Sequence, residues 1–169
     1  MENAVVPMEL EASEEVVDGL KGKYLTFHIA DEDYGIEIRH VTEIIGIQAI
    51  TDVPDLPEFI RGVINLRGNV IPVMDVRLRF RLPEKPYEER TCIVVVNVDD
   101  KTVGLVVDRV NEVVDISDKD IEPPPRTKSE SSQYILGMGK IGDQVKILLD
   151  VRRLLYSEEM EKFRQKKGE

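Results

Sequence analysis

The sequence predicts an all-β protein made of small barrels or a sandwich, in which one β unit occurs twice. Three observations predict this fold class. Short runs of alternating apolar and polar residues recur along the chain, as in half-buried strands. Residues 62–75 contain two apolar runs on either side of Gly68 and Asn69, which is typical of a β-hairpin. Two blocks of sequence recur later in the chain in the same order, which indicates a duplication.

Composition limits the size of the protein and the kinds of partner it takes. A chain of 169 residues, of which 41% are hydrophobic, suits one compact domain or two very small ones. The net charge of −10 repels polyphosphate, so we expect no nucleic-acid partner. The single cysteine, Cys92, excludes an intrachain disulfide and is predicted to be a buried strand residue. There is no secretory signal pattern, and no apolar run reaches the roughly 18 residues that span a bilayer. We therefore expect a soluble, cytoplasmic protein with no membrane insertion.

The first strands are predicted from period-two patterns. Residues 1–22 are acidic, and we expect a tail or a weakly docked strand there. Residues 24–30 alternate, a polar turn follows, and residues 34–38 and 41–45 are β-rich runs. Strands of this length and spacing favour small barrels or a sandwich.

The hairpin over residues 62–75 is predicted to place Leu66 opposite Ile71 and Ile64 opposite Val73 on one core face. A two-residue turn would put Pro72 at a hydrogen-bonded site, where its missing N–H loses a ladder bond. We therefore favour a four-residue loop over residues 67–70, which keeps the same facing pairs.

The other face of the hairpin is mostly apolar and carries one guanidinium, that of Arg67. An apolar strip with a single arginine is typical of a protein-binding patch. Burial of this face inside the same domain, with Arg67 projecting outward, is equally compatible with the sequence, and both alternatives stay open here. The residues of this face are Val63, Asn65, Arg67, Val70, Pro72 and Met74.

The duplication appears as two matching blocks. Residues 35–45 resemble residues 104–114 (104 − 35 = 69 positions), and residues 73–77 resemble residues 148–152 (150 − 75 = 75 positions). An insertion in the proline-rich loop after Glu122 accounts for the difference. The position of Arg67 corresponds to Gly142, so we infer that Arg67 serves something other than the fold.

Asp75 and Asp150 are the one pair of carboxylates that invites a catalytic interpretation, because a duplicated fold could bring them together. Each precedes a Val-Arg pair and a leucine-rich turn, which favours helix N-caps. His28 and His40 lack the spacing of metal ligands. We therefore predict no catalytic, metal or cofactor site. Short helices are expected after both aspartates, and the second is predicted to run to about residue 164.

Glu43 and its counterpart Glu112 lie in otherwise apolar strands. The simpler interpretation is an exposed position on a half-buried strand. The alternative applies to Glu43 only, as a polar residue at the rim of a docking patch.

These segments together resemble the CheW family of chemotaxis coupling proteins, over about residues 20–160. The resemblance implies two five-stranded SH3-like barrels around a shared hydrophobic centre, related by the internal repeat, with short helices and a C-terminal helix. It also implies a tail over residues 1–22 and a domain over residues 23–160, with subdomains at about 23–85 and 90–150. The matching segments are residues 33–38, 54–59, 61–68, 71–77, 103–108 and 154–155.

The resemblance implies a non-enzymatic adaptor without cofactors. Its expected partners are the cytoplasmic tip of methyl-accepting chemoreceptors and the regulatory domain of the histidine kinase CheA. The alternative is a detached CheA-type regulatory domain that binds other CheW-like modules. The residues that correspond to receptor-binding positions are Val41, Gly62, Asn65, Arg67 and Gly68, and those that correspond to kinase-facing surface positions are Glu43 and Ile44.

Overall fold

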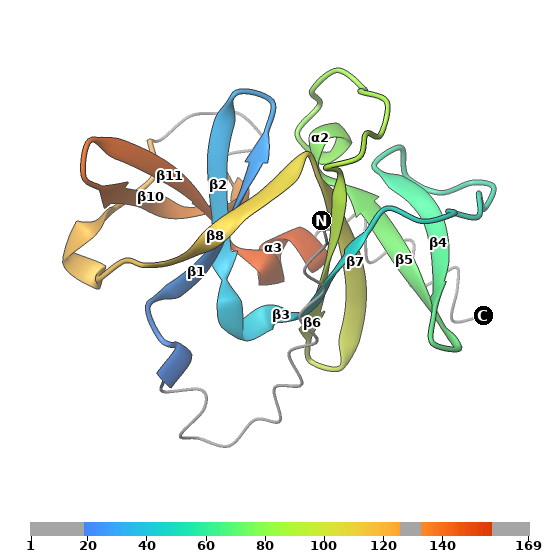
Figure 1. The fold of residues 1–169 in the computed structure, drawn as a ribbon, viewed down its shortest axis with the longest axis horizontal. Coiled ribbons are helices and arrows are strands. Elements are labelled where there is room, and N and C mark those ends of the chain that lie inside the picture. Colours follow the sequence, from blue (N-terminus) through green and yellow to red (C-terminus); the bar gives the residue numbers. More distant parts are fainter. Residues whose placement is uncertain (1–18, 126–132, 157–169) are drawn as a thin grey trace.

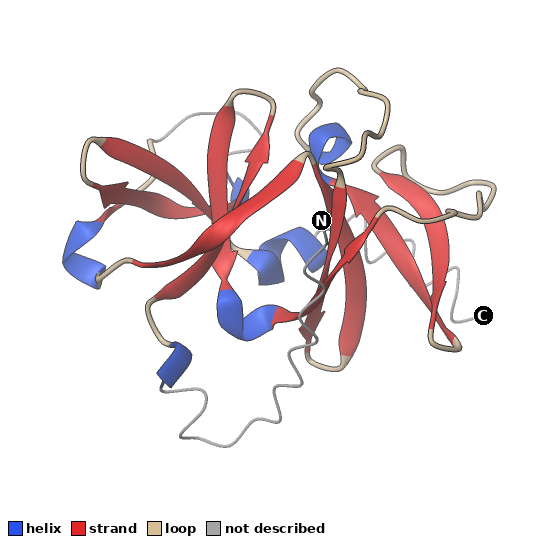
Figure 2. Ribbon diagram, in the orientation of Figure 1, coloured by secondary structure: helices blue, strands red, loops and turns tan. Residues whose placement is uncertain are grey.

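The computed structural model describes residues 19–125 and 133–156, and it confirms the all-β fold class. Two sheets lie side by side, with short helices between and beside them (Figures 1 and 2). Sheet A has the strand order β8-β1-β2-β11-β10-β9, and sheet B has the order β3-β6-β7-β5-β4. The predicted tail before residue 19 and the predicted helix beyond residue 156 lie outside the described residues.

The elements are short. Sheet A consists of β1 (Lys23–Ile29), β2 (Glu32–Glu37), β8 (Arg109–Asp115), β9 (Ile121–Glu122), β10 (Ile135–Ile141) and β11 (Gln144–Leu149). Sheet B consists of β3 (Val41–Gly46), β4 (Ile60–Leu66), β5 (Asn69–Asp75), β6 (Cys92–Val98) and β7 (Lys101–Val107). The helices are α2 (Val76–Arg79), α3 (Val151–Leu155) and the 3₁₀ turns η1 (Ile38–His40) and η2 (Asp118–Asp120).

The two repeats exchange strands. The first repeat, residues 23–79, places β1 and β2 in sheet A but β3, β4 and β5 in sheet B. The second repeat, residues 92–155, does the reverse with β6 and β7 against β8, β10 and β11. The predicted subdomains at 23–85 and 90–150 therefore do not correspond to the two sheets. The reason is that the chain crosses from one sheet to the other at η1 and again after β7.

The register confirms the duplication. The β4–β5 ladder shifts between Ile60 and Gly62, and the β10–β11 ladder shifts at the corresponding residues, Ile135 and Gly137. In sheet B, Thr51 forms an isolated bridge with Val63 of β4. At the corresponding place in sheet A, β9 pairs with β10. The two sheets are thus copies of one design, built from complementary parts of the chain.

The recurring glycines Gly35 and Gly104 lie where strands from different repeats pair in parallel. Gly104 lies opposite Val73, and Gly35 lies opposite Leu148. A Cβ on Gly104 would lie 2.7 Å from the Ile93 side chain, and one on Gly35 would lie 3.0 Å from that of Leu148. The glycine in the repeated block is therefore required by close packing.

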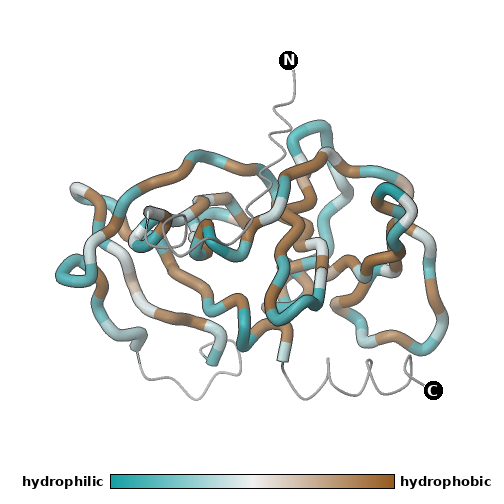
Figure 3. Tube along the Cα trace, turned by 90° about the horizontal axis from the view of Figure 1, so that it is seen from below, coloured by the Kyte–Doolittle hydropathy of each residue, from teal (hydrophilic) through white to brown (hydrophobic). Residues whose placement is uncertain are grey.

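The main hydrophobic core lies between the two sheets. Buried side chains from β1 and β2 meet others from β6, β7 and both helices, including Phe27, Ile36, Val94, Leu105 and Leu154. Each such side chain contributes about 1.5–3 kcal/mol when fully buried. Figure 3 shows apolar residues interspersed with polar ones along both halves of the trace, as expected for strands with one buried face. The shared hydrophobic centre implied by the resemblance is present.

The structure confirms the two predicted helix caps and corrects the predicted burial of the cysteine. The Asp75 carboxylate accepts the backbone N–H of Arg77 at 2.9 Å, and that of Asp150 accepts the N–H of Arg153 at 3.1 Å. Both aspartates are therefore helix N-caps. Cys92 lies in β6 as predicted but is only half-buried. Among the described residues, no helix is both long and apolar enough to cross a membrane.

Candidate functional site

The tip of the β4–β5 hairpin is a two-residue turn formed by Arg67 and Gly68, both with positive φ (51° and 87°). Leu66 pairs with Asn69 on either side of it, and the Asn65 side chain accepts the N–H of Gly68 at 2.9 Å. The predicted four-residue loop is therefore wrong, because the Asn65 amide and the twist of a primed turn favour the tighter connection.

The facing pairs of the hairpin are also shifted from the prediction. Ile64 lies opposite Ile71, and Pro72 lies opposite Val63. Both backbone groups of Val63 bond to Thr51 on the far side of β4. The missing N–H of Pro72 therefore costs no ladder bond, which removes the objection to a tight turn. The predicted core face is confirmed, because Ile64, Ile71 and Val73 are buried together.

The outer face of the hairpin forms an exposed patch, which we call the tip patch and define as Asn65, Arg67, Gly68 and Val70. Val70 is 58% exposed, and the Arg67 side chain is 66% exposed. Met74 departs from the prediction, because it is fully buried in the core between the sheets. The tip patch thus joins one apolar side chain, one amide and one guanidinium on a projecting turn.

Arg67 is held by an ion pair with Glu43 of β3. Arg67 Nη1 donates to Glu43 Oε1 at 3.0 Å, and Nη2 donates to Oε2. The Glu43 side chain is only 7% exposed, so its predicted surface position is wrong. β3 and β4 are the two edge strands of sheet B and are not hydrogen-bonded to each other. The bidentate ion pair therefore connects the two edge strands. Its geometry is favourable because the planar guanidinium matches the two oxygens of the carboxylate.

The other predicted positions are less exposed. Val41 is fully buried between the sheets, so it cannot contact a partner in this conformation. Gly62 is buried with φ of 146°, and an added Cβ would overlap the Thr51 carbonyl. Its role is to let the chain before β4 pack against the hairpin. Ile44 is half-buried and packs against the main core.

The contact between Glu43 and Arg67 does not follow from the sequence. Their opposite charges in apolar strands were the available signal, but the sequence does not reveal that β3 and β4 are the edges of one sheet. Gln48, which donates to the Asn65 carbonyl at 3.4 Å, was also missed and carries no pattern that could have revealed it.

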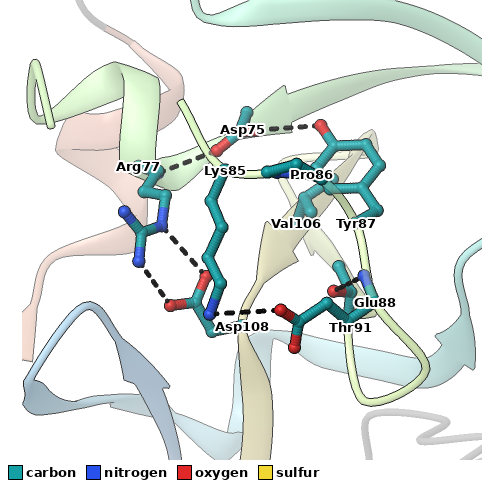
Figure 4. Close-up of a pocket in the computed structure, with 9 residues that line it drawn as sticks. All are labelled: Asp75, Arg77, Lys85, Pro86, Tyr87, Glu88, Thr91, Val106 and Asp108. Atoms are coloured by element: carbon teal, nitrogen blue, oxygen red, sulfur yellow. Dashed lines mark hydrogen bonds and ion pairs between the residues drawn. The ribbon is translucent and has the colours of Figure 1, made fainter. Parts of the chain in front are cut away.

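A second polar cluster lies where the linker between the repeats passes α2 (Figure 4). The Tyr87 hydroxyl donates to Asp75 at 2.8 Å, and burial, followed by the Asp75 charge, raises the tyrosine pKa. Arg77 donates to both carboxylate oxygens of Asp108, at 3.2 and 2.9 Å. The Asp75 carboxylate is thus occupied as a helix cap and as the acceptor of Tyr87, which argues against the hydrolase interpretation. Within residues 19–125 and 133–156, no cluster of three or more metal-ligating side chains occurs.

Comparison with known proteins identifies what this arrangement is similar to. The model of the CheW-like domain matches residues 23–159. A chemotaxis protein CheW of Klebsiella aerogenes is 38% identical over 139 residues, covering 82% of this chain and 84% of that protein. One from Helicobacter pylori is 36% identical over 145 residues, covering 86% and 85%. The crystal structure of the scaffolding protein TtCheW from Thermoanaerobacter tengcongensis superposes with a TM-score of 0.75 at 35% identity, covering 82% of this chain and 90% of that one.

Proposed function

Because this chain belongs to the CheW-like domain family, we propose that it is a non-enzymatic, cytoplasmic adaptor that couples chemoreceptors to the histidine kinase CheA. The similar proteins are named for chemotaxis and for scaffolding, which supports a holding role in that signalling system. The two carboxylates that invited a catalytic interpretation both serve as helix caps. The proposed mechanism is therefore the rigid positioning of two partners.

The observation that carries the proposal is the tip patch on a fixed hairpin. Arg67 projects from a tight turn, yet its guanidinium is oriented by a buried carboxylate. An oriented arginine loses less side-chain entropy on binding than a mobile one. A smaller part of the interaction free energy is therefore offset, and the affinity is higher. Val70 adds exposed apolar area beside it. A receptor helix laid on this patch would gain affinity from Val70 and register from Arg67.

The proposed roles of the other residues follow from their burial. Asn65 and Gly68 shape the turn, Gly62 lets the chain at Thr51 pack against the hairpin, and Val41 anchors β3 in the core between the sheets. Ile44 is the half-exposed position of the proposed kinase surface. Glu43 belongs to that proposal through the position it gives Arg67, because its own carboxylate is covered.

The proposal is tested by the variant Arg67→Ala. We expect weaker binding of a chemoreceptor cytoplasmic-tip fragment, by about tenfold or more, since a central arginine contributes roughly 1.4 kcal/mol or more at such sites. Isothermal titration measures the dissociation constant, and circular dichroism verifies the fold.

The matched control is Arg152→Ala, which removes another exposed arginine that is ion-paired, here with Asp99 at 2.5 Å. It should leave receptor binding unchanged. Pull-down with the CheA regulatory domain tests the second partner, for which Ile44→Asp should reduce recovery. Equal receptor affinity of the wild type and Arg67→Ala would exclude the tip patch as the receptor surface.

A further inference from the structure

A cavity of about 290 Å³ lies between the start of β4 and the linker over residues 80–91, which joins the two repeats. It adjoins the polar cluster of Figure 4, with which it shares the linker residues Lys85, Pro86 and Tyr87. Pockets that bind small molecules begin at roughly 300 Å³. The cavity combines an aromatic ring and a proline with two cations and one carboxylate, and it shares no residue with the tip patch. The lining residues are Arg61, Glu84, Lys85, Pro86 and Tyr87.

One wall of the cavity, the Tyr87 ring, is fixed by the fold. The Tyr87 hydroxyl donates to Asp75 at 2.8 Å, and the ring packs against the apolar cluster of sheet B. Asp75 is itself fixed as the N-cap of α2. The Arg61 guanidinium lies over the same ring, with its central carbon 5.8 Å from the ring centroid, which is a cation–π distance. The ring and the guanidinium are therefore positioned relative to each other in advance, which lowers the entropy cost of binding a ligand.

The structure shows which chemical group Arg61 accepts at this place. Arg61 Nη2 lies 2.6 Å from Glu84 Oε1, so a carboxylate already contacts the guanidinium. That carboxylate belongs to the linker, and its side chain is 58% exposed, against 34% for that of Arg61. An exposed ion pair of this kind is weak, and the carboxylate of a ligand can replace it. Glu84 thus marks the position of a bound carboxylate.

The repeat shows that Arg61 is not required by the fold. The corresponding residue of the second repeat is Leu136 (136 − 61 = 75 positions, the shift that relates Asp75 to Asp150). Both residues lie at the register shift of their hairpin, so the backbone is the same in the two copies. An arginine in one copy and a leucine in the other indicates that Arg61 serves a purpose besides folding.

We propose that this cavity binds an organic carboxylate. The ligand's carboxylate replaces Glu84 on Arg61, its apolar body packs against Tyr87 and Pro86, and Lys85 adds a second positive charge. Two sources supply such a group, a free small acid or an acidic side chain of a partner protein, and both use the same guanidinium. The proposal is independent of the proposed function, because it uses no residue of the tip patch.

The test is a titration of isotope-labelled protein, followed by the amide signals of Arg61 and of residues 84–88 in NMR spectra. Benzoate is the probe for a free acid, and an acetylated and amidated Ala-Glu-Ala peptide is the probe for a partner's side chain. Benzamide and the corresponding Ala-Gln-Ala peptide are the neutral controls. We expect saturable shifts with at least one of the two acids, with a dissociation constant in the millimolar range, and none with the neutral controls.

Two variants should change the affinity in opposite directions. Glu84→Gln removes the competing carboxylate and should tighten binding about two- to fivefold, which is the contribution of an exposed ion pair. Arg61→Leu installs the residue of the second repeat and should weaken binding about tenfold or more, because a charged hydrogen bond is lost. The matched control is Asp99→Asn, which removes a carboxylate that contacts an exposed arginine, Arg152, beside another tyrosine, Tyr156, outside the cavity. It should leave the affinity unchanged.

The two probes distinguish the two sources of the carboxylate. Binding of the peptide alone would assign the site to a partner protein, and binding of benzoate would assign it to a small acid, so either result supports the proposal. Absence of saturable shifts with both probes in Glu84→Gln would overturn it. Equal affinities of the wild type, Glu84→Gln and Arg61→Leu would place the ligand elsewhere and overturn it as well. Circular dichroism verifies each fold, and Glu84→Gln, at an exposed side chain, decides the question if Arg61→Leu does not fold.

Discussion

The two sheets share one strand order but differ in what fills them. In sheet B, Ile71 and Val95 belong to an apolar cluster. The corresponding positions in sheet A are Lys146 and Thr26, both buried. Lys146 Nζ bonds Asp33 at 2.8 Å. At these two positions, therefore, sheet B has apolar side chains, whereas sheet A has a buried lysine paired with Asp33 beside a smaller apolar cluster.

The edge strands β3 of sheet B and β8 of sheet A also differ, in how far their glutamates are buried. In sheet B, Glu43 is buried under Arg67, and β3 is largely covered. In sheet A, the corresponding Glu112 is exposed and the counterpart of Arg67 is Gly142, so β8 has no such cover. The two repeats thus share the backbone fold and the helix caps but differ in where a charged pair lies. In sheet B the pair connects the edge strands β3 and β4, and in sheet A it lies on the sheet itself, between Lys146 and Asp33.

The largest effect is expected at the close contacts beside the hairpins. Gly62→Ala combines a φ of 146° with overlap between the new Cβ and the Thr51 carbonyl, and should lower the free energy of unfolding by about 4 kcal/mol. The corresponding Gly137→Ala meets the Ile121 side chain at 2.6 Å and the Glu122 carbonyl at 2.9 Å without positive φ. It should cost about 2 kcal/mol. Urea denaturation measures both, and equal losses would show that backbone strain adds nothing at Gly62.

A smaller effect is expected at the buried charge of sheet A. Lys146→Ala removes the 2.8 Å hydrogen bond from Nζ to the Asp33 carboxylate, which is 28% exposed and keeps its bonds with His28 and Asn111, and should cost about 2 kcal/mol. The double variant Lys146→Ile with Asp33→Thr installs the residues of sheet B, Ile71 and Thr102. It should recover most of the loss in urea denaturation. A double variant as unstable as Lys146→Ala would show that the interiors are not interchangeable.

The sequence predicted what depends on neighbouring residues and missed what depends on distant ones. The period-two pattern of residues 24–30 gave β1, and the residues after Asp75 gave its cap. Sheet membership is not local, because η1 carries the chain from β2 in one sheet to β3 in the other. The burial of Glu43 follows from that crossing. The turn at Arg67 was missed because arginine rarely adopts positive φ.

The largest single contribution to the acid dependence of stability should come from Asp33 in sheet A, whose carboxyl pKa is lowered more than that of Asp108. Hydrogen bonds from His28 and then Lys146 hold the pKa of Asp33 at about 2, below its ordinary value of 3.8. A depressed carboxyl pKa contributes stability that is complete above about pH 4 and is lost as the pH falls through about 2. The contribution is about 2 kcal/mol at most. Asp33→Asn should remove this part of the acid transition, measured as urea midpoints between pH 2 and 5, and Asp115→Asn is the exposed control.

The smallest effect on stability is expected at the ion pair between the edge strands β3 and β4 of sheet B. Arg67→Ala removes the partner of a buried carboxylate, but the arginine itself is 66% exposed and water can replace it. We expect a loss of about 1 kcal/mol in urea denaturation. The converse variant, Gly142→Arg, places an arginine at a φ of 57°, close to the 51° of Arg67. It should gain nothing, because the exposed Glu112 offers no desolvated carboxylate. A stabilised Gly142→Arg would mean that an arginine at the hairpin tip stabilises either sheet. The presence of Arg67 in only one of the two hairpins would then no longer support a binding role for it.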